Sequence, residues 1–350
     1  MHQPSTLSER AAGAPESTTS NGVDHDVPSH ASPPVSSVSP VSPVSPLTPA
    51  WRRVGADVSG AATAHEALAA AGLDWSVQAR PLAIAGSSDR IAGHKAIVRS
   101  DTGDVLGVVG SRYQPIQNLE AFAWADRVVG SGGAAFECAG VMGGGKLVWM
   151  LLRLAGELRG GSTDDVTRPY VLVVNAHDGS RSLLVLRTAV RLVCSNTLLA
   201  VLREAKRRTL ALRHTSGSLD RLDEAREVLG LAACEFDRMR LAMTAMAAVR
   251  FAEADARGFF AGLLPPREGE GADPLLESLM VAWHDPRQQM PGIAGTLWAA
   301  VNAVTQYADW ERPARGEGAE REQRRLRSMW LGPGAALKAK AWNAAERLIA

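Results

Sequence analysis

Residues 169–199 read PYVLVVNAHDGSRSLLVLRTAVRLVCSNTLL, and this stretch decides the fold. Two apolar runs rich in β-branched residues, 170–174 and 183–186, flank a polar turn that contains Asp178-Gly179. An Asp-Gly pair between two such runs is typical of a tight connection between antiparallel strands. The stretch therefore predicts a β-hairpin.

The segments on either side predict more sheet. A second hairpin is expected around Gly143-Gly144-Gly145, and the apolar run 147–152 predicts a strand covered on both faces. Other strands are expected at residues 75–82, 95–99, 105–109 and 209–214, and helices at 63–72, 118–129 and 196–208. The last of these helices would place Leu198, Leu199 and Leu202 on one face.

Beyond Leu219 the apolar pattern becomes helical. Helices are predicted at residues 219–256, 274–284, 295–309 and 337–349. The fold class is therefore α+β: a mainly antiparallel sheet with flanking helices, followed by a helical C-terminal region. We expect a disordered Pro/Ser-rich tail at residues 1–50, an α+β sheet domain at 51–216 and a helical region at 217–350.

Composition limits the class of protein. The chain has 38 Lys and Arg residues against 37 Asp and Glu residues, so any basic surface must be local. Three widely separated cysteines suit a reducing, cytoplasmic location. No apolar run is long enough to span a bilayer, so no membrane partner is expected. The sequence allows a homo-oligomer and leaves it unknown whether the protein uses a cofactor.

The hairpin turn carries candidate catalytic residues. His177 would act as a general base oriented by Asp178, and Cys194 would be the nucleophile. The alternative is structural: Asp178 before Gly179 is explained by turn geometry, and a lone cysteine in an apolar run is usually buried. A metal site from His177, Asp178 and His214 would need the two strands side by side, and no paired His or Cys spacing supports one.

Residues 177–214 hold eight basic residues against two acidic ones. Arginines at strand ends and on a following helix can form a groove that follows the phosphates of a nucleic acid. The alternative is that they pair with acidic residues of the helix after Leu219. The candidate nucleic-acid-binding residues are Arg181, Arg187, Arg191, Asn196, Arg203, Arg207, Arg213 and His214.

Several separated motifs carry a resemblance to a family. They are 106-LGVVG-110 with 113-YQPIQN-118, 144-GGKLVW-149, 175-NAHDGS-180, 191-RLVCSNTL-198, 213-RHT-215, 295-GTLW-298, 302-NAVT-305 and 331-LGPGA-335 with Lys338 and Ala341. Over about residues 105–350 the chain resembles the phage/plasmid-like protein family known as domain of unknown function 932. The resemblance implies a protein of prokaryotic viruses, plasmids and their hosts, with no established biochemistry.

These observations favour a protein of phage or plasmid DNA metabolism, encoded on a mobile genetic element, that binds single-stranded DNA. Two alternatives stay open. One is an enzyme of unknown reaction that uses His177, Asp178 and Cys194. The other is a protein-interaction module in phage replication or host interference.

Overall fold

The hairpin around Asp178-Gly179 is at the centre of the sheet. The computed structural model describes residues 48–87, 89–160, 164–192, 195–199, 210–215, 224–265 and 273–350. In it, β8 (Val166–Ala176) and β9 (Leu183–Arg191) pair antiparallel, with Tyr170 opposite Thr188 and Val174 opposite Leu184. The predicted hairpin is therefore present.

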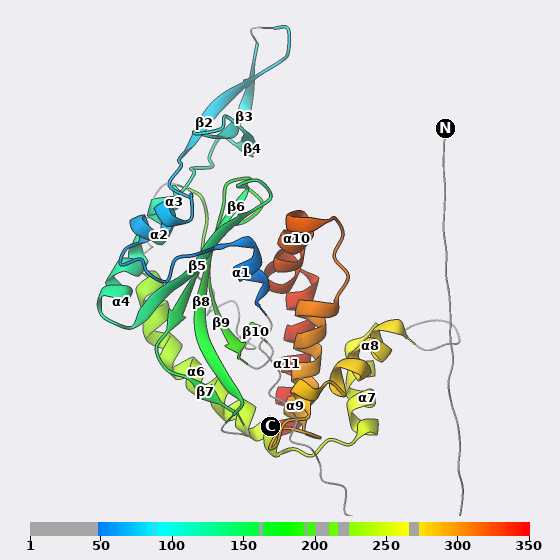
Figure 1. Cartoon of the computed structure of the whole chain (residues 1–350). Coiled ribbons are helices and arrows are strands. Elements are labelled where there is room, and N and C mark those ends of the chain that lie inside the picture. The colour runs from blue at the N-terminus through cyan, green and yellow to red at the C-terminus, as the bar shows by residue number, and fades with distance from the viewer. Residues whose placement is uncertain are drawn as a thin grey trace, which may run out of the picture. The chain divides into compact units, whose positions relative to one another are not determined.

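Within the described residues the large sheet has eight strands in the order β1-β5-β6-β8-β9-β10, with β7 beside β8 and β11 beside β9. All of its pairings are antiparallel, and the sheet is curled (Figure 1). Its other strands are β1 (Ala56–Asp57), β5 (Ala134–Met142), β6 (Leu147–Leu154), β7 (Leu158–Arg159), β10 (Asn196–Leu199) and β11 (Leu210–Leu212).

A separate three-stranded sheet precedes it. It consists of β2 (Val77–Ala83), β3 (Arg90–Arg99) and β4 (Val105–Gly110), in that order. The far end of the β2–β3 hairpin extends away from the large sheet (Figure 1). Its base is anchored because Ile97 of β3 and Leu106 of β4 are buried in the same core as the large sheet.

Alternating side chains of β6 show that both faces of the large sheet are covered, as its apolar run predicts. Val148 and Met150 pack in one core with the helices Ala64–Ala70 and Asn118–Phe122, which precede β5. Trp149 and Leu151 pack on the opposite face against Trp330 of the C-terminal region. The helices before β5 are α1 (Ala50–Val54), α2 (Ala64–Ala70), α3 (Asn118–Phe122), the 3-10 turn η1 (Ala123–Ala125) and α4 (Asp126–Gly130).

The C-terminal region is helical and packs on the sheet. Leu158 and Ala189 of the sheet share a core with Met243, Trp298 and Trp342. The helices are α6 (Glu224–Ala248), α7 (Glu253–Leu263), α8 (Pro274–Trp283), η3 (Pro286–Gln288), α9 (Leu297–Gln306), the π-helical η4 (Tyr307–Glu311), α10 (Gly318–Leu331) and α11 (Pro333–Ile349). No helix among the described residues is both long and apolar enough to cross a bilayer. The α+β class is confirmed.

Several segments differ from the sequence-based expectations, and the predicted helix 118–129 is divided into α3, η1 and α4. Asn196–Leu199 is not the start of a helix but strand β10, which pairs with Thr188–Arg191 of β9. A continuous helix over 219–256 is also wrong at its C-terminal end, because α6 ends at Ala248 and α7 starts at Glu253. Residues 1–47 of the expected tail lie outside the described residues. Ala50, the last residue of the expected tail, is buried in α1. The domain boundary at 216/217 stays a prediction.

Candidate functional site: a cationic groove

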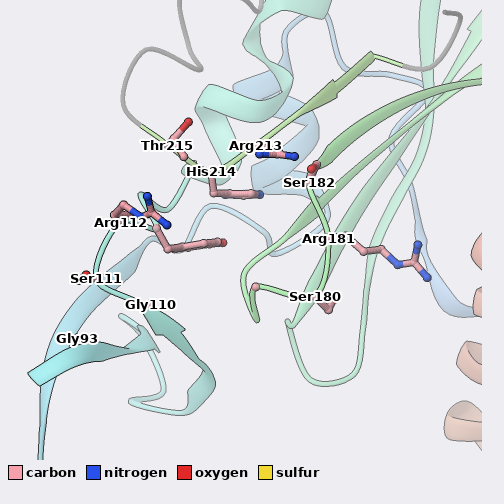
Figure 2. Close-up of a pocket in the computed structure, with 12 residues that line it drawn as sticks. Gly93, Gly110, Ser111, Arg112, Ser180, Arg181, Ser182, Arg213, His214 and Thr215 are labelled. Carbon is pink, nitrogen blue, oxygen red and sulfur yellow. The ribbon is translucent and has the colours of Figure 1, made fainter. Parts of the chain in front are cut away.

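A polar groove lies where the β8–β9 turn meets the C-terminal ends of β4 and β11 (Figure 2). Its volume is about 740 Å³, within the range of about 300–1,000 Å³ usual for ligand sites. It is lined by Gly93, Gly110, Ser111, Arg112, Tyr113, Gly179, Ser180, Arg181, Ser182, Arg213, His214 and Thr215. Four segments that are far apart in the sequence therefore meet in one site.

Two glycines allow the β8–β9 turn and β4 to lie close together. A Cβ atom added to Gly107 of β4 would lie 2.6 Å from the Asp178 Cα atom, which is too close for any side chain. Gly179 has a φ of +74°, and a Cβ there would lie 2.8 Å from Val109 Cγ1. The Ser180 backbone N–H donates to Asp178 Oδ1 at 2.9 Å and stabilises the turn.

Backbone hydrogen bonds hold the other segments in place. The Ser111 N–H donates to the Gly93 carbonyl at 2.9 Å, and the Gln114 N–H donates to the His214 carbonyl at 2.8 Å. The segment that follows β4 is thus fastened both to β3 and to the segment that follows β11. The walls of the groove are defined by main-chain contacts rather than by side chains alone.

The groove carries positive charge. Arg112 and Arg213 are exposed, and Arg181 is half-buried, with its Nη2 donating to the Leu331 carbonyl at 3.0 Å. Figure 2 shows the Arg181 side chain directed away from His214. No Asp or Glu is among the described residues that line the groove, although Asp178 lies in the adjoining turn. Guanidinium and hydroxyl groups together favour an anionic ligand such as a phosphate.

His214 forms part of the wall and has unused hydrogen-bonding capacity. Its ring is 4% exposed and stacks on Tyr113, with 4.7 Å between centroids and 9° between planes. Neither ring nitrogen has a hydrogen-bond partner among the described residues. Burial lowers the pKa of His214 to about 4, so the imidazole is neutral at pH 7. A neutral imidazole can donate one hydrogen bond to a ligand in the groove.

His177, the candidate base, is directed into the core. The Asn118 Nδ2 donates to the Leu73 and Trp75 carbonyls at 2.9 and 3.2 Å, which leaves Asn118 Oδ1 to accept from His177 Nε2 at 2.8 Å. Burial lowers the pKa of His177 to about 3, and the ring is fully covered. In this position His177 orders the loop before α3 and does not line the groove.

The remaining members of the candidate catalytic set do not assemble around His177. Asp178 caps its own turn, and Cys194 lies outside the described residues. Among the described side chains no group of three His, Cys, Asp or Glu residues is arranged to hold a metal ion. The catalytic hypothesis therefore gains no support from the geometry.

The candidate nucleic-acid-binding residues are divided between the groove and the core. Arg181, Arg213 and His214 line the groove, whereas Arg187, Arg191 and Asn196 are buried, and the last two of these contact the helical region. Arg191 forms an ion pair with Asp165, which precedes β8, rather than with the long helix α6. Asn196 Nδ2 donates to Thr305 Oγ1 at 3.1 Å. Arg203 and Arg207 lie outside the described residues.

Sequence reasoning missed Arg112 as a member of the site. The segment Gly110-Ser111-Arg112-Tyr113 follows a strand, and its glycine fits both a phosphate loop and an ordinary strand end. The distinguishing feature is that β4 and β11 end at the same place, which only the tertiary structure shows.

Comparisons with known proteins give one match. The family model described as "Domain of unknown function (DUF932)" matches residues 105–330, which include β4, the β8–β9 turn and β11. No curated protein and no solved structure matches the chain.

Proposed function

The chain belongs to the DUF932 family, whose description names no activity, and from this premise we propose that it binds single-stranded nucleic acid in the groove. The observation that carries the proposal is that Arg112, Arg181 and Arg213 line one groove whose described lining residues include no carboxylate. Cationic grooves of this kind follow the phosphate backbone, and binding is sequence-tolerant because phosphates carry no base information.

Two further features support a nucleic-acid phosphate as the ligand. The hydroxyl groups of Ser111, Ser180, Ser182 and Thr215 offer neutral donors at the rim. Tyr113, which is half-buried and stacks on His214, is the aromatic side chain with exposed area beside them, and unpaired bases stack on aromatic side chains. We place this activity in phage or plasmid DNA metabolism in the cytoplasm, which the family resemblance and the cysteine usage favour.

Fluorescence anisotropy with a labelled single-stranded oligonucleotide, over a salt series, tests the proposal. Arg112 is exposed and has no ion pair among the described residues, so Arg112→Glu should leave the fold intact. We expect affinity about tenfold weaker or more and a shallower dependence on salt, because each lost phosphate contact removes about 0.7 from the slope of log K against log salt.

The matched control is Arg238→Glu, the same charge reversal at an exposed position on α6. His214→Phe keeps the stack on Tyr113 but removes the ring nitrogens, and it should also weaken binding. The proposal fails if the wild-type protein does not bind at low salt, or if Arg112→Glu reduces affinity no more than Arg238→Glu.

A further inference from the structure

The β2–β3 hairpin ends in an arm, which we define as residues 80–87 and 89–95. β4 pairs with β3 only from His94 to Val98, so the arm beyond His94 has no third strand. All but two of the described residues of the arm are exposed. Figure 1 shows the arm extending away from the large sheet and the helices. An isolated two-stranded ribbon is marginally stable in water, so a partner would stabilise it.

The arm is cationic. Arg80 and Arg90 are exposed and Lys95 is half-exposed, and Asp89 is the single acidic residue in residues 80–95. Within the described part of the chain none of these three cations forms an ion pair. The arm therefore presents positive charge that the fold itself does not use, and a polyanion is the complementary partner.

Exposed apolar side chains lie at the distal end of the arm. Ile84 is 56% exposed and Ile91 is 43% exposed. The tip is closed by the Ile84 N–H, which donates to the Asp89 carbonyl at 3.1 Å. Nothing in the described residues covers these two isoleucines. Apolar side chains beside cations are the features that insert between base steps when a protein grips a DNA groove.

The arm is continuous with the groove. The β2–β3 register shifts between Pro81 and Ala83, so β3 carries extra residues that include Gly93, whose φ is +78°. Gly93 also lines the groove and accepts the hydrogen bond from Ser111. Bulges of this kind bend a ribbon and are frequent beside binding sites. A nucleic acid that leaves the groove on this side would meet the arm.

We propose that the arm binds double-stranded DNA that adjoins the strand held in the groove, so that the protein recognises a junction between single- and double-stranded DNA. This inference rests on the proposed function of the groove. The choice of duplex follows from the side chains: the arm has no Phe, Tyr or Trp on which unpaired bases could stack, whereas its isoleucines suit insertion at a base-pair step. Its cations contact the phosphates that flank the step.

The test uses three probes in anisotropy: a single strand, a blunt duplex and a duplex with a single-stranded tail. The arm variant carries Arg80→Gln, Arg90→Gln and Lys95→Gln. It should bind the single strand within about twofold of wild type and bind both duplex probes about tenfold more weakly, as three lost phosphate contacts imply. The matched control carries Arg238→Gln, Arg315→Gln and Arg347→Gln, which removes the same charge from exposed positions of the helical region.

Ile84→Gln tests insertion separately, by energy transfer between dyes at the two ends of the duplex. Wild-type protein should bend the duplex and Ile84→Gln should bend it less. The inference is overturned if the arm variant binds duplex as tightly as the control, or if Ile84→Gln instead converts a dimer to a monomer in light scattering. Loss of single-strand binding by Arg112→Glu is a separate result, so the groove and the arm can fail independently.

Discussion

Lys338 Nζ donates to Asp309 Oδ1 at 2.6 Å and to Thr197 Oγ1 at 2.7 Å, and both charged side chains are buried. The contact joins α11, η4 and β10. Burial raises the pKa of Asp309 and lowers the pKa of Lys338, so each group depends on the other to remain charged. Removal of either partner would leave the other charge buried alone.

Lys338→Met should therefore lower the free energy of unfolding by about 3–5 kcal/mol, the usual cost of an unpaired buried charge. Adding Asp309→Leu to Lys338→Met should recover much of the loss, because the pair is then replaced by apolar side chains. Urea unfolding followed by circular dichroism measures both. Lys340→Met, an exposed lysine on the same helix, is the control and should change stability by less than about 1 kcal/mol.

The periodicity of the apolar residues predicted most of the sheet, but it could not identify β10. Asn196-Thr197-Leu198-Leu199 is too short to distinguish a helix from a strand by periodicity. Pairing with Thr188–Arg191 and the contacts of Asn196 and Thr197 with η4 and the end of α9 decide its structure. The helical partners of Asn196 and Thr197 lie more than 100 residues away in the sequence.

Helix α10 was missed for a different reason. Its sequence is rich in charged residues, and besides Arg325 its buried residues form a single short stripe of Leu326, Met329 and Trp330. A stripe of three apolar residues is a weak signal beside so many charges. Trp330 nevertheless stacks on Trp51 of α1 with 6.3 Å between centroids, so the helix closes one face of the sheet.

Acid should destabilise the protein through His177 and His214. Burial lowers the pKa of His214 from 6.5 to about 4 and that of His177 to about 3, so the unfolded chain binds more protons than the native protein below pH 6.5. Stability is therefore fully present above pH 6.5 and falls as the pH drops towards 4 and then 3. Each pKa unit corresponds to about 1.4 kcal/mol, so the loss should reach several kcal/mol.

The measurement is urea unfolding at a series of pH values from 7 to 4. His214→Phe should flatten the fall in stability because it removes one of the two groups. The exposed His284, at the end of α8, provides the control variant His284→Gln, which should reproduce the wild-type curve. Equal pH dependence in wild type and His214→Phe would contradict a buried, neutral His214.

The contacts of Arg191 are those of a structural arginine rather than of a ligand-binding one. Its side chain is fully covered, and besides the Asp165 ion pair its Nη1 donates to Gln288 Oε1 at 2.9 Å and its Nη2 to the Arg287 carbonyl at 3.1 Å. Asp165 also accepts from Trp298 Nε1 at 2.6 Å. This network fastens β9 and the segment before β8 to η3 and α9, so it holds the helical region on the sheet.

Arg191→Met should therefore destabilise the protein by about 3–5 kcal/mol, because Asp165 would be left as a buried, unpaired carboxylate. Arg168→Met on the neighbouring β8 is the matched control: its contact with Glu157, at 3.5 Å, is exposed and should contribute less than about 1 kcal/mol. Under conditions where Arg191→Met remains folded, it should bind single-stranded DNA as wild type does. If Arg191→Met is as stable as Arg168→Met but does not bind DNA, Arg191 contacts the ligand. The helical region would then have to open for DNA to reach the Arg191 side chain.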